Sequence, residues 1–267
     1  MPRVLRDPLF TAADSLVLTD RHIANLAAGT LAAVRVPAFL SGPTCESAMA
    51  ELDRLPTTDY DPARVPTPIL RFGPALNDYR TPDGALDADR YWPAAEAARA
   101  AWSRAGIRPD PIAVSLARLG SAWGAAVVPA TIGGRPVFGG TLREINNGAL
   151  IHYDDLNREM PALFDQQLVA QLAFNVWVRI PGNGGETTVW RRRWEPADED
   201  HRDAYGFQPA TVTRCQHVTL APQAGDALLF NSANFHAVRP NQGHGQRRIA
   251  FSFFLGLTTT GQLTAWS

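Results

Sequence analysis

Three residues of this chain, His152, Asp154 and His236, have the types and spacing of a metal site. Two imidazole nitrogens and one carboxylate oxygen bind a divalent cation and leave several coordination positions open. This ligand set suits a catalytic non-haem Fe(II) centre, where oxygen and a co-substrate must both reach the metal. Asp155 is an alternative carboxylate. Because residues i and i+2 of a strand share a face, His152 and Asp154 are expected to converge, and Asp155 is not.

A basic residue shortly after His236 could bind the far carboxylate of a dicarboxylate co-substrate. A guanidinium does this with two parallel hydrogen bonds. Both Arg247 and Arg248 are candidates, and we favour Arg248 because of the strand alternation that follows it. The small or polar face carries Arg248, Ala250 and Ser252, and the bulky apolar face carries Ile249, Phe251 and Phe253.

The segment before His236 contains the Gly225-Asp226 pair, an apolar stretch at 227–230 and a short polar crossover at 231–234. This pattern predicts a tight turn that leads into a buried strand and then into the strand of His236. The third metal ligand would therefore come from a strand next to that of His152.

The first part of the sequence predicts helices with short strands. Helices are expected at 20–28, where Asp20 would be the N-cap, at 43–55, at 91–105 and at 111–123, with glycines after three of them. A strand is expected at 31–36, and the Pro-, Asp- and Gly-rich segment 57–89 is expected to be irregular.

From residue 125 onward, short β-rich runs alternate with Gly, Pro and Asn, as in an antiparallel sandwich or barrel. Gly133-Gly134 and 182–185 are expected to form hairpin turns, and 155–164 a loop with a short helix. Helices followed by strands indicate an α+β fold with helices packed on one face of a double-sheet core. Strands are expected at 125–130, 137–145, 149–153, 168–180, 187–192, 214–220, 227–230, 235–239 and 247–256.

The composition is that of a globular protein, with 267 residues, 45% hydrophobic and 19% charged. The net charge of −1 gives no reason to expect a nucleic-acid partner, and the basic run 191–193 is interpreted as a solvated strand end. The two cysteines show no CxxC spacing, and no apolar run is long enough for a signal peptide or a membrane span. We therefore expect a cytoplasmic protein without membrane partners.

Taken together, these motifs resemble the Fe(II)/2-oxoglutarate-dependent dioxygenase superfamily, whose core is a double-stranded β-helix, or jelly roll. Its HxD…H triad matches His152, Asp154 and His236, and its co-substrate arginine follows the second histidine at a spacing similar to that of Arg248. The run 140–148 and the Gly184-Gly185 segment are also similar to elements around the triad. The resemblance covers roughly residues 110–260, in a chain expected to form one domain. Residues 1–110 would be a mainly helical support region, and residues 111–260 the catalytic jelly roll.

The resemblance implies Fe(II), 2-oxoglutarate as co-substrate, and O2. It implies an oxygenase that oxidises, most simply hydroxylates, an unactivated C–H bond of a small molecule such as an amino acid or natural-product intermediate. Related halogenases replace the acidic ligand with Gly or Ala, so Asp154 points to hydroxylation.

Several alternatives stay open at this point. The same iron chemistry can give desaturation or cyclisation, and a cupin-like metal-binding isomerase or a non-catalytic binding module would use a similar barrel. The last two would not need Arg248. Asn175, Trp190 and Arg143 could line the cavity, but sequence alone does not assign them. Neither does it give the oligomeric state.

Overall fold

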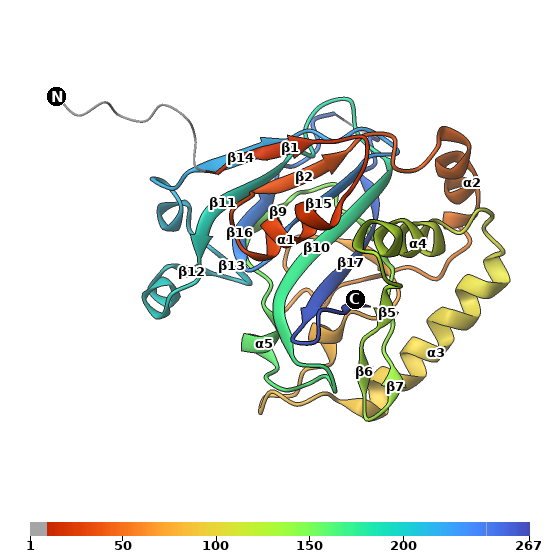
Figure 1. Cartoon of the computed structure of the whole chain (residues 1–267), viewed down its shortest axis with the longest axis horizontal. Coiled ribbons are helices and arrows are strands. Elements are labelled where there is room, and N and C mark those ends of the chain that lie inside the picture. Colours follow the sequence, from red (N-terminus) through yellow and green to blue (C-terminus); the bar gives the residue numbers. More distant parts are fainter. Residues whose placement is uncertain (1–9, 244) are drawn as a thin grey trace.

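A computed structural model describes residues 10–243 and 245–267. Two β-sheets form the centre of the molecule, and helices surround one side of it (Figure 1). The larger sheet has ten strands in the order β1-β2-β15-β10-β17-β8-β4-β3, with β18 paired to β17 and β5 paired to β18. These strands are β1 Ala12–Asp14, β2 Ala33–Val36, β3 Thr58–Asp59, β4 Leu70–Phe72, β5 Val128–Pro129, β8 Thr141–Glu144, β10 Leu168–Arg179, β15 Ala227–Asn231, β17 Ile249–Thr258 and β18 Leu263–Trp266.

The smaller sheet has six strands in the order β12-β13-β9-β16-β11-β14. Most neighbours in both sheets are antiparallel, and β10 lies between β15 and β17 in the larger one. The strands of the smaller sheet are β9 Ala149–His152, β11 Thr187–Arg193, β12 Arg202–Asp203, β13 Gly206–Phe207, β14 His217–Leu220 and β16 Asn234–Val238; a separate hairpin joins β6 Thr131–Ile132 to β7 Arg135–Pro136.

The helices begin and end at residues that favour these positions. Thr19 and Asp110 accept hydrogen bonds from the first-turn amides of α1 and α4, and Gly106 and Gly124 end α3 and α4 in the left-handed conformation. The helices are α1 Asp20–Ala27, α2 Gly42–Leu52, α3 Ala88–Ala105, α4 Pro111–Trp123 and α5 Leu156–Glu159, with 3-10 turns at Leu76–Tyr79, Pro196–His201 and Pro209–Thr211.

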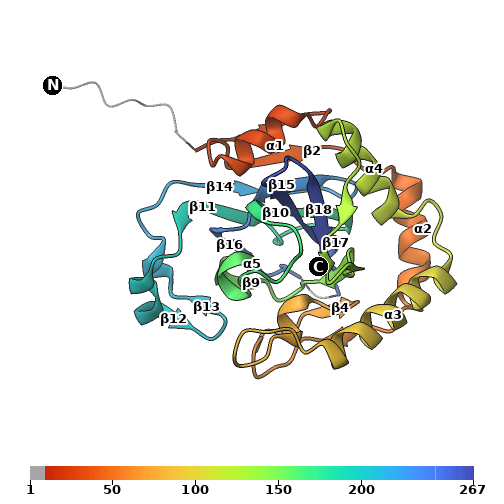
Figure 2. The ribbon, with the colours of Figure 1, turned by 60° about the horizontal axis from the view of Figure 1, so that its bottom comes forward.

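Helices α1 and α2 contact β10 of the larger sheet, and α4 contacts both of these helices. Figure 2 shows α1, α4, α2 and α3 following one another around the outside of this sheet. No helix in the described part of the chain combines the length and apolarity that a membrane crossing requires.

The alternation expected in β17 is confirmed. Ile249 and Phe251 belong to the apolar core on the helix side, whereas Ala250 belongs to the core between the sheets together with Trp177. Arg248 and Ser252 line a cavity on this inner side. The larger sheet therefore has a packed apolar layer on its helix side and a cavity lined by polar side chains on its inner side.

The main helices and the expected strands from residue 137 onward are found, with ends that shift by a few residues. The helix expected from Asp20 is capped by Thr19 instead. The strand expected at 125–130 is reduced to β5, and β18 is an additional strand. The segment before residue 110 is more than a helical support, because β2 pairs with β15 and β4 pairs with β8.

The expectation of a hairpin at 182–185 is wrong, whereas Gly133-Gly134 does form one, between β6 and β7. Strands β10 and β11 belong to different sheets, so 182–185 connects the sheets. Here glycine is needed for close approach to another segment. Gly184 has φ +81°, and a Cβ on it would lie 2.2 Å from the Pro240 carbonyl oxygen.

Candidate metal centre

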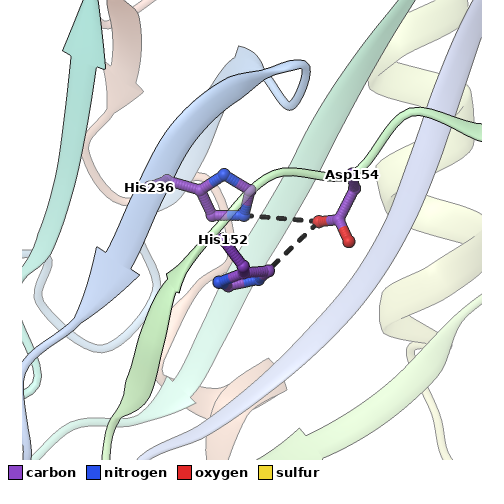
Figure 3. A group of neighbouring side chains, drawn as sticks. All are labelled: His152, Asp154 and His236. Atoms are coloured by element: carbon purple, nitrogen blue, oxygen red, sulfur yellow. Dashed lines mark ion pairs between the residues drawn. The ribbon is translucent and has the colours of Figure 1, made fainter. Parts of the chain in front are cut away.

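His152, Asp154 and His236 come together at the neighbouring strands β9 and β16 of the smaller sheet (Figure 3). His152 is the last residue of β9, and its Cα partner on the neighbouring strand β16 is His236. The Asp154 Oδ2 atom lies 3.9 Å from His152 Nε2 and 3.3 Å from His236 Nε2. One ligand atom from each residue lies within 4.8 Å of the others, so the convergence expected from strand parity is confirmed.

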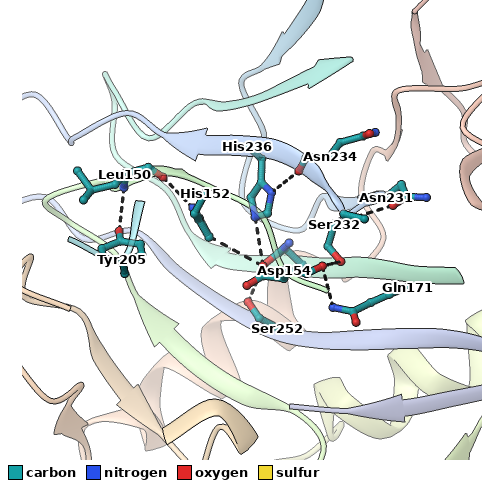
Figure 4. A network of polar contacts seen from close by, with 12 residues as sticks. Leu150, His152, Asp154, Gln171, Tyr205, Asn231, Ser232, Asn234, His236 and Ser252 are labelled. Carbon is teal, nitrogen blue, oxygen red and sulfur yellow. Dashed lines mark hydrogen bonds and ion pairs between the residues drawn. The ribbon is translucent and has the colours of Figure 1, made fainter. Parts of the chain in front are cut away.

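Backbone carbonyls fix the orientation of both imidazoles (Figure 4). His152 Nδ1 lies 2.7 Å from the Leu150 carbonyl oxygen, and His236 Nδ1 lies 2.9 Å from that of Asn234. A carbonyl oxygen only accepts, so each Nδ1 carries the proton and donates it. Each Nε2 then presents its lone pair to the centre, as a metal ligand requires.

The backbone of Asp154 is held as firmly. Its amide donates to the Ser232 carbonyl oxygen at 2.9 Å, and its own carbonyl accepts from Ser232 Oγ at 3.0 Å and Gln171 Nε2 at 3.2 Å. Asp155 instead caps α5 by accepting from the Arg158 amide, which leaves Asp154 as the carboxylate of the group.

The electrostatics of the group favour the protonation states of metal ligands. Burial first, and then the neighbouring His236, lower the pKa of His152 to about 4. Burial alone would raise the pKa of Asp154, but the interactions with His236 and His152 outweigh it and lower the pKa to about 2. At neutral pH His152 is therefore uncharged and Asp154 ionised, so this donor set fits a divalent cation.

The three side chains face a cavity of about 620 Å³ that also reaches Arg248. Asn175 and Ser252 are directly opposite each other on β10 and β17, and Ser252 Oγ donates to Asn175 Oδ1 at 2.6 Å. Asn175 and Arg143 both line this cavity. Trp190 packs instead against the apolar cluster of Phe207, Val212 and Phe235 and is not among the lining residues.

Arg248 is a buried cation whose contacts are to neutral groups. It is 3% exposed, and burial lowers its pKa to about 10. Its guanidinium donates to the Gly185 carbonyl oxygen at 2.9 Å and to Thr187 Oγ1 at 3.2 Å, with the Trp177 ring centre 5.2 Å away. Among the described residues no carboxylate forms an ion pair with it, so the site fits a carboxylate ligand.

Arg247 is satisfied within the protein. Its Nη2 lies 2.7 Å from Glu144 Oε2, and its Nη1 lies 3.1 Å from Asp53 Oδ1. The two candidates for binding a co-substrate carboxylate are thus clearly distinguished by their partners.

Other polar residues of the cavity were not found by sequence reasoning. Tyr60 and Arg80 come from the segment interpreted as irregular, Glu159 from the short helix after the triad, and Tyr205 from the connection between β12 and β13. The Tyr205 hydroxyl accepts from the Leu150 amide at 2.8 Å, and its ring packs edge-on to His152 at 5.6 Å. No local spacing marks these residues, because only the tertiary fold brings them to the triad.

Comparison with known proteins agrees with this geometry. A family model described as "Carrier-protein-independent halogenase WelO5" matches residues 121–267. The chain is 55% identical to L-gamma-glutamyl-L-propargylglycine hydroxylase of Streptantibioticus cattleyicolor, over 97% of this chain and 96% of that protein. It is 34% identical to Leucinostatins biosynthesis cluster protein S of Purpureocillium lilacinum, over 46% of this chain and 53% of that protein.

Solved structures show the same fold. An N-substituted L-amino acid dioxygenase from Burkholderia ambifaria, in complex with α-ketoglutarate, aligns over 93% of this chain and 91% of that chain, with a TM-score of 0.63 at 18% identity. The mixed α+β architecture with antiparallel sheets is therefore that of the 2-oxoglutarate oxygenases. With a complete HxD…H triad and these matches, the chain belongs to the Fe(II)/2-oxoglutarate-dependent oxygenase family, as a hydroxylase.

Proposed function

We propose that the enzyme hydroxylates the amino-acid side chain of a γ-glutamyl dipeptide, with L-γ-glutamyl-L-propargylglycine as the first candidate. The observation that carries this proposal is the 55% identity, over nearly the whole of both chains, to a hydroxylase of that dipeptide. The cavity of about 620 Å³ has room for a dipeptide, and charged side chains line it.

In this proposal, His152, Asp154 and His236 bind the iron. With 2-oxoglutarate and O2, the metal supplies the oxidising chemistry that places a hydroxyl group on an unactivated carbon. The protein keeps both imidazoles in the ligand tautomer through the Leu150 and Asn234 carbonyls. His236 is buried and the other two ligands are half-buried at the cavity, which limits the access of water.

Arg248 is assigned to the far carboxylate of 2-oxoglutarate. A buried guanidinium without an acidic partner is unfavourable alone, and a carboxylate ligand removes that cost. Asn175, across the strand pair from Ser252, is a candidate for a further hydrogen bond to the co-substrate. A cupin-like isomerase or binding module would leave Arg248 without a role.

Asp154 argues for hydroxylation over halogenation, although the matching family model is described as a halogenase. The carboxylate lies beside both histidines and would occupy the coordination position that a halide needs. Desaturation or cyclisation remains the alternative outcome of the same oxidation.

We also propose that residues 1–267 act as one domain, with a double-stranded β-helix core and N-terminal helices packed on the larger sheet. Residues before 110 complete the sheet as well as covering it. Cys45 and Cys215 are free thiols, which is consistent with an enzyme of the cytoplasm.

The test is a reaction of the purified protein with Fe(II), 2-oxoglutarate, O2 and a set of γ-glutamyl dipeptides. We expect succinate and a product heavier by one oxygen atom in equal amounts, as measured by mass spectrometry. A product that has lost two hydrogen atoms would establish desaturation instead. If succinate forms without any change in the dipeptides, the proposed substrate class is wrong.

A further inference from the structure

The cavity contains a second guanidinium that forms no ion pair with a carboxylate of the described residues, that of Arg143 on β8. Its Cα partner on β17 is Ala250, so Arg143 lies on the same inner face as Arg248 and Ser252. Its Nε donates to the Tyr60 hydroxyl at 3.0 Å. No acidic side chain of the described residues lies within ion-pair distance, and its other nitrogens have no protein partner there.

The arginine next to Arg143 on the adjacent strand has an acidic partner, in contrast to Arg143. Arg71 is the Cα partner of Arg143 on β4, and its guanidinium forms an ion pair with Asp78 and also donates to the Gly73 carbonyl oxygen. Arg143 lacks such a partner. It remains charged, because burial, which lowers its pKa, is outweighed by Tyr60, Asp154 and Asp78 together. Because 2-oxoglutarate is assigned to Arg248, the guanidinium of Arg143 is available to a second anionic ligand.

A pair of opposite charges lies elsewhere in the cavity lining. Glu159, at the end of α5, is partly buried, and its carboxylate forms no ion pair among the described residues. Arg80 is exposed beside it, and its Nη1 lies 3.3 Å from the Glu159 carbonyl oxygen. The Arg80 charge also acts on the pKa of the Glu159 carboxylate, which it lowers, although the two groups form no ion pair among the described residues. Such a carboxylate and guanidinium match the ammonium and carboxylate of one α-amino-acid head group.

We propose that Arg143 binds the carboxylate of the residue being oxidised, and that Glu159 and Arg80 bind the ammonium and carboxylate of the γ-glutamyl head group. This inference rests on the proposed function. A γ-glutamyl dipeptide has two carboxylates and one ammonium, because its second amine forms the amide bond. Arg143, Arg80 and Glu159 supply two cations and one anion, which is the complementary set.

The position of Arg143 decides which carboxylate it binds. Asp154 is close enough to Arg143 to affect its pKa, whereas Arg80 is an exposed residue. The carbon to be oxidised must lie at the metal, and the carboxylate of the same residue is only a few bonds away from it. Arg143 therefore suits the carboxylate of the reacting residue, and the exposed Arg80 suits that of the head group. Glu159, whose pKa is raised by burial and also by Asp154, suits the ammonium.

Two further arginines of the cavity lining share one carboxylate, whereas the exposed Arg64 donates to the Asn77 carbonyl oxygen. Arg202 donates from Nε and Nη2 to Glu199 at 2.7 and 3.0 Å, and Arg158 lies 3.7 Å from the same carboxylate. Arg202 thus provides a matched control, since it lines the same cavity with its charge neutralised.

The experiment compares the iron-loaded wild type with Arg143→Gln, Arg143→Lys, Glu159→Gln and Arg202→Gln. Each enzyme is assayed on the dipeptide and on its analogue with a C-terminal carboxamide. For the wild type we expect kcat/KM to fall about 100-fold on the carboxamide. Arg143→Gln should lose a similar factor on the acid and almost none on the carboxamide, and Arg143→Lys should recover part of the loss.

Glu159→Gln should raise KM about tenfold for the dipeptide but not for an analogue whose γ-glutamyl amine is replaced by hydrogen. Arg202→Gln should behave like the wild type, and the KM for 2-oxoglutarate should stay unchanged throughout. Equal turnover of acid and carboxamide by the wild type would overturn the assignment of Arg143, even if the variants fail to fold. So would a rise in the KM for 2-oxoglutarate in Arg143→Lys.

The proposed function fails separately from this inference. If the wild type hydroxylates none of the γ-glutamyl dipeptides, the substrate class itself is wrong. If it hydroxylates them without distinguishing the acid from the carboxamide, only the recognition assigned to Arg143 is wrong.

Discussion

Arg247 and Arg248 are consecutive in the sequence but lie on opposite faces of the larger sheet, with opposite electrostatic surroundings. Arg247 forms ion pairs with Glu144 and Asp53 on the helix side. Arg248 lies in the inner cavity, where the Gly185 carbonyl and the Thr187 hydroxyl accept from its side chain. One residue of strand parity thus separates a structural arginine from one that is available to a ligand.

Replacing each arginine should therefore have a different result. Arg248→Ala should raise the KM for 2-oxoglutarate on the order of 100-fold, because it removes a buried charged partner of the co-substrate. Arg247→Ala should leave this KM nearly unchanged and lower the free energy of unfolding, since Glu144 is buried and would lose its partner. Steady-state kinetics at varied 2-oxoglutarate measures the first effect, and the reverse order would reassign the co-substrate site to Arg247.

Asp154→Ala should abolish hydroxylation and weaken iron binding, because two neutral imidazoles remain and the anionic ligand is lost. The matched control is Asp155→Ala, which removes a helix cap and leaves the triad intact. Bound iron measured by elemental analysis and product measured by mass spectrometry should fall in the first variant only. Full activity of Asp154→Ala would show that another carboxylate binds the metal.

The turn before β15 depends on a buried carboxylate. Asp226 is 3% exposed and accepts from Arg35 Nε at 2.7 Å and from the Ala38 and Gln223 amides. It also forms an ion pair with Arg35 Nη2 at 2.7 Å. Asp226→Ala leaves these donors unsatisfied, and we expect it to lower the free energy of unfolding by about 3 kcal/mol.

Asp14 provides the control for this prediction. It also approaches Arg35, at 3.8 Å, but its side chain is 65% exposed. Asp14→Ala should change the free energy of unfolding by less than about 0.5 kcal/mol in a denaturant titration. Equal losses of unfolding free energy in Asp226→Ala and Asp14→Ala would show that the burial of Asp226 adds nothing to stability.

The convergence of the triad and the placement of Arg248 in the cavity could be predicted from sequence because the alternation of side chains is a local property. Residues two apart on an extended chain share a face, so His152 at the end of β9 and Asp154 just beyond it were expected to converge. The same rule separated Arg248 from Arg247. The strand of His236 then needed only to be the neighbour of β9, which the structure confirms.

The rest depends on pairings that no short segment encodes. The glycines at 182–185 looked like a hairpin, but local sequence does not say that β10 and β11 join different sheets. Arg143 was visible as a strand residue, yet its lack of an acid is evident only beside Arg71 and Asp78. Loop residues such as Tyr205 reach the cavity through tertiary contacts alone.

Glu159 should make the stability of the protein depend on pH. Burial first, and then Asp154 and Asp155, raise its pKa to about 7 against the opposing effect of Arg80. Its folded-state pKa exceeds the unfolded value, so its contribution to stability is present in acid and is lost as pH rises through about 7. Glu159→Gln should remove this loss, so the melting temperature of the variant should rise relative to that of the wild type between pH 5 and 7.5.

The measurement uses iron-free protein, so that metal binding does not affect the comparison. Glu199→Gln is the control, because the hydrogen bond from Arg202 lowers the pKa of Glu199 and places its titration below this window. A constant difference between Glu159→Gln and the wild type across the window would show that Glu159 is already ionised in the folded protein.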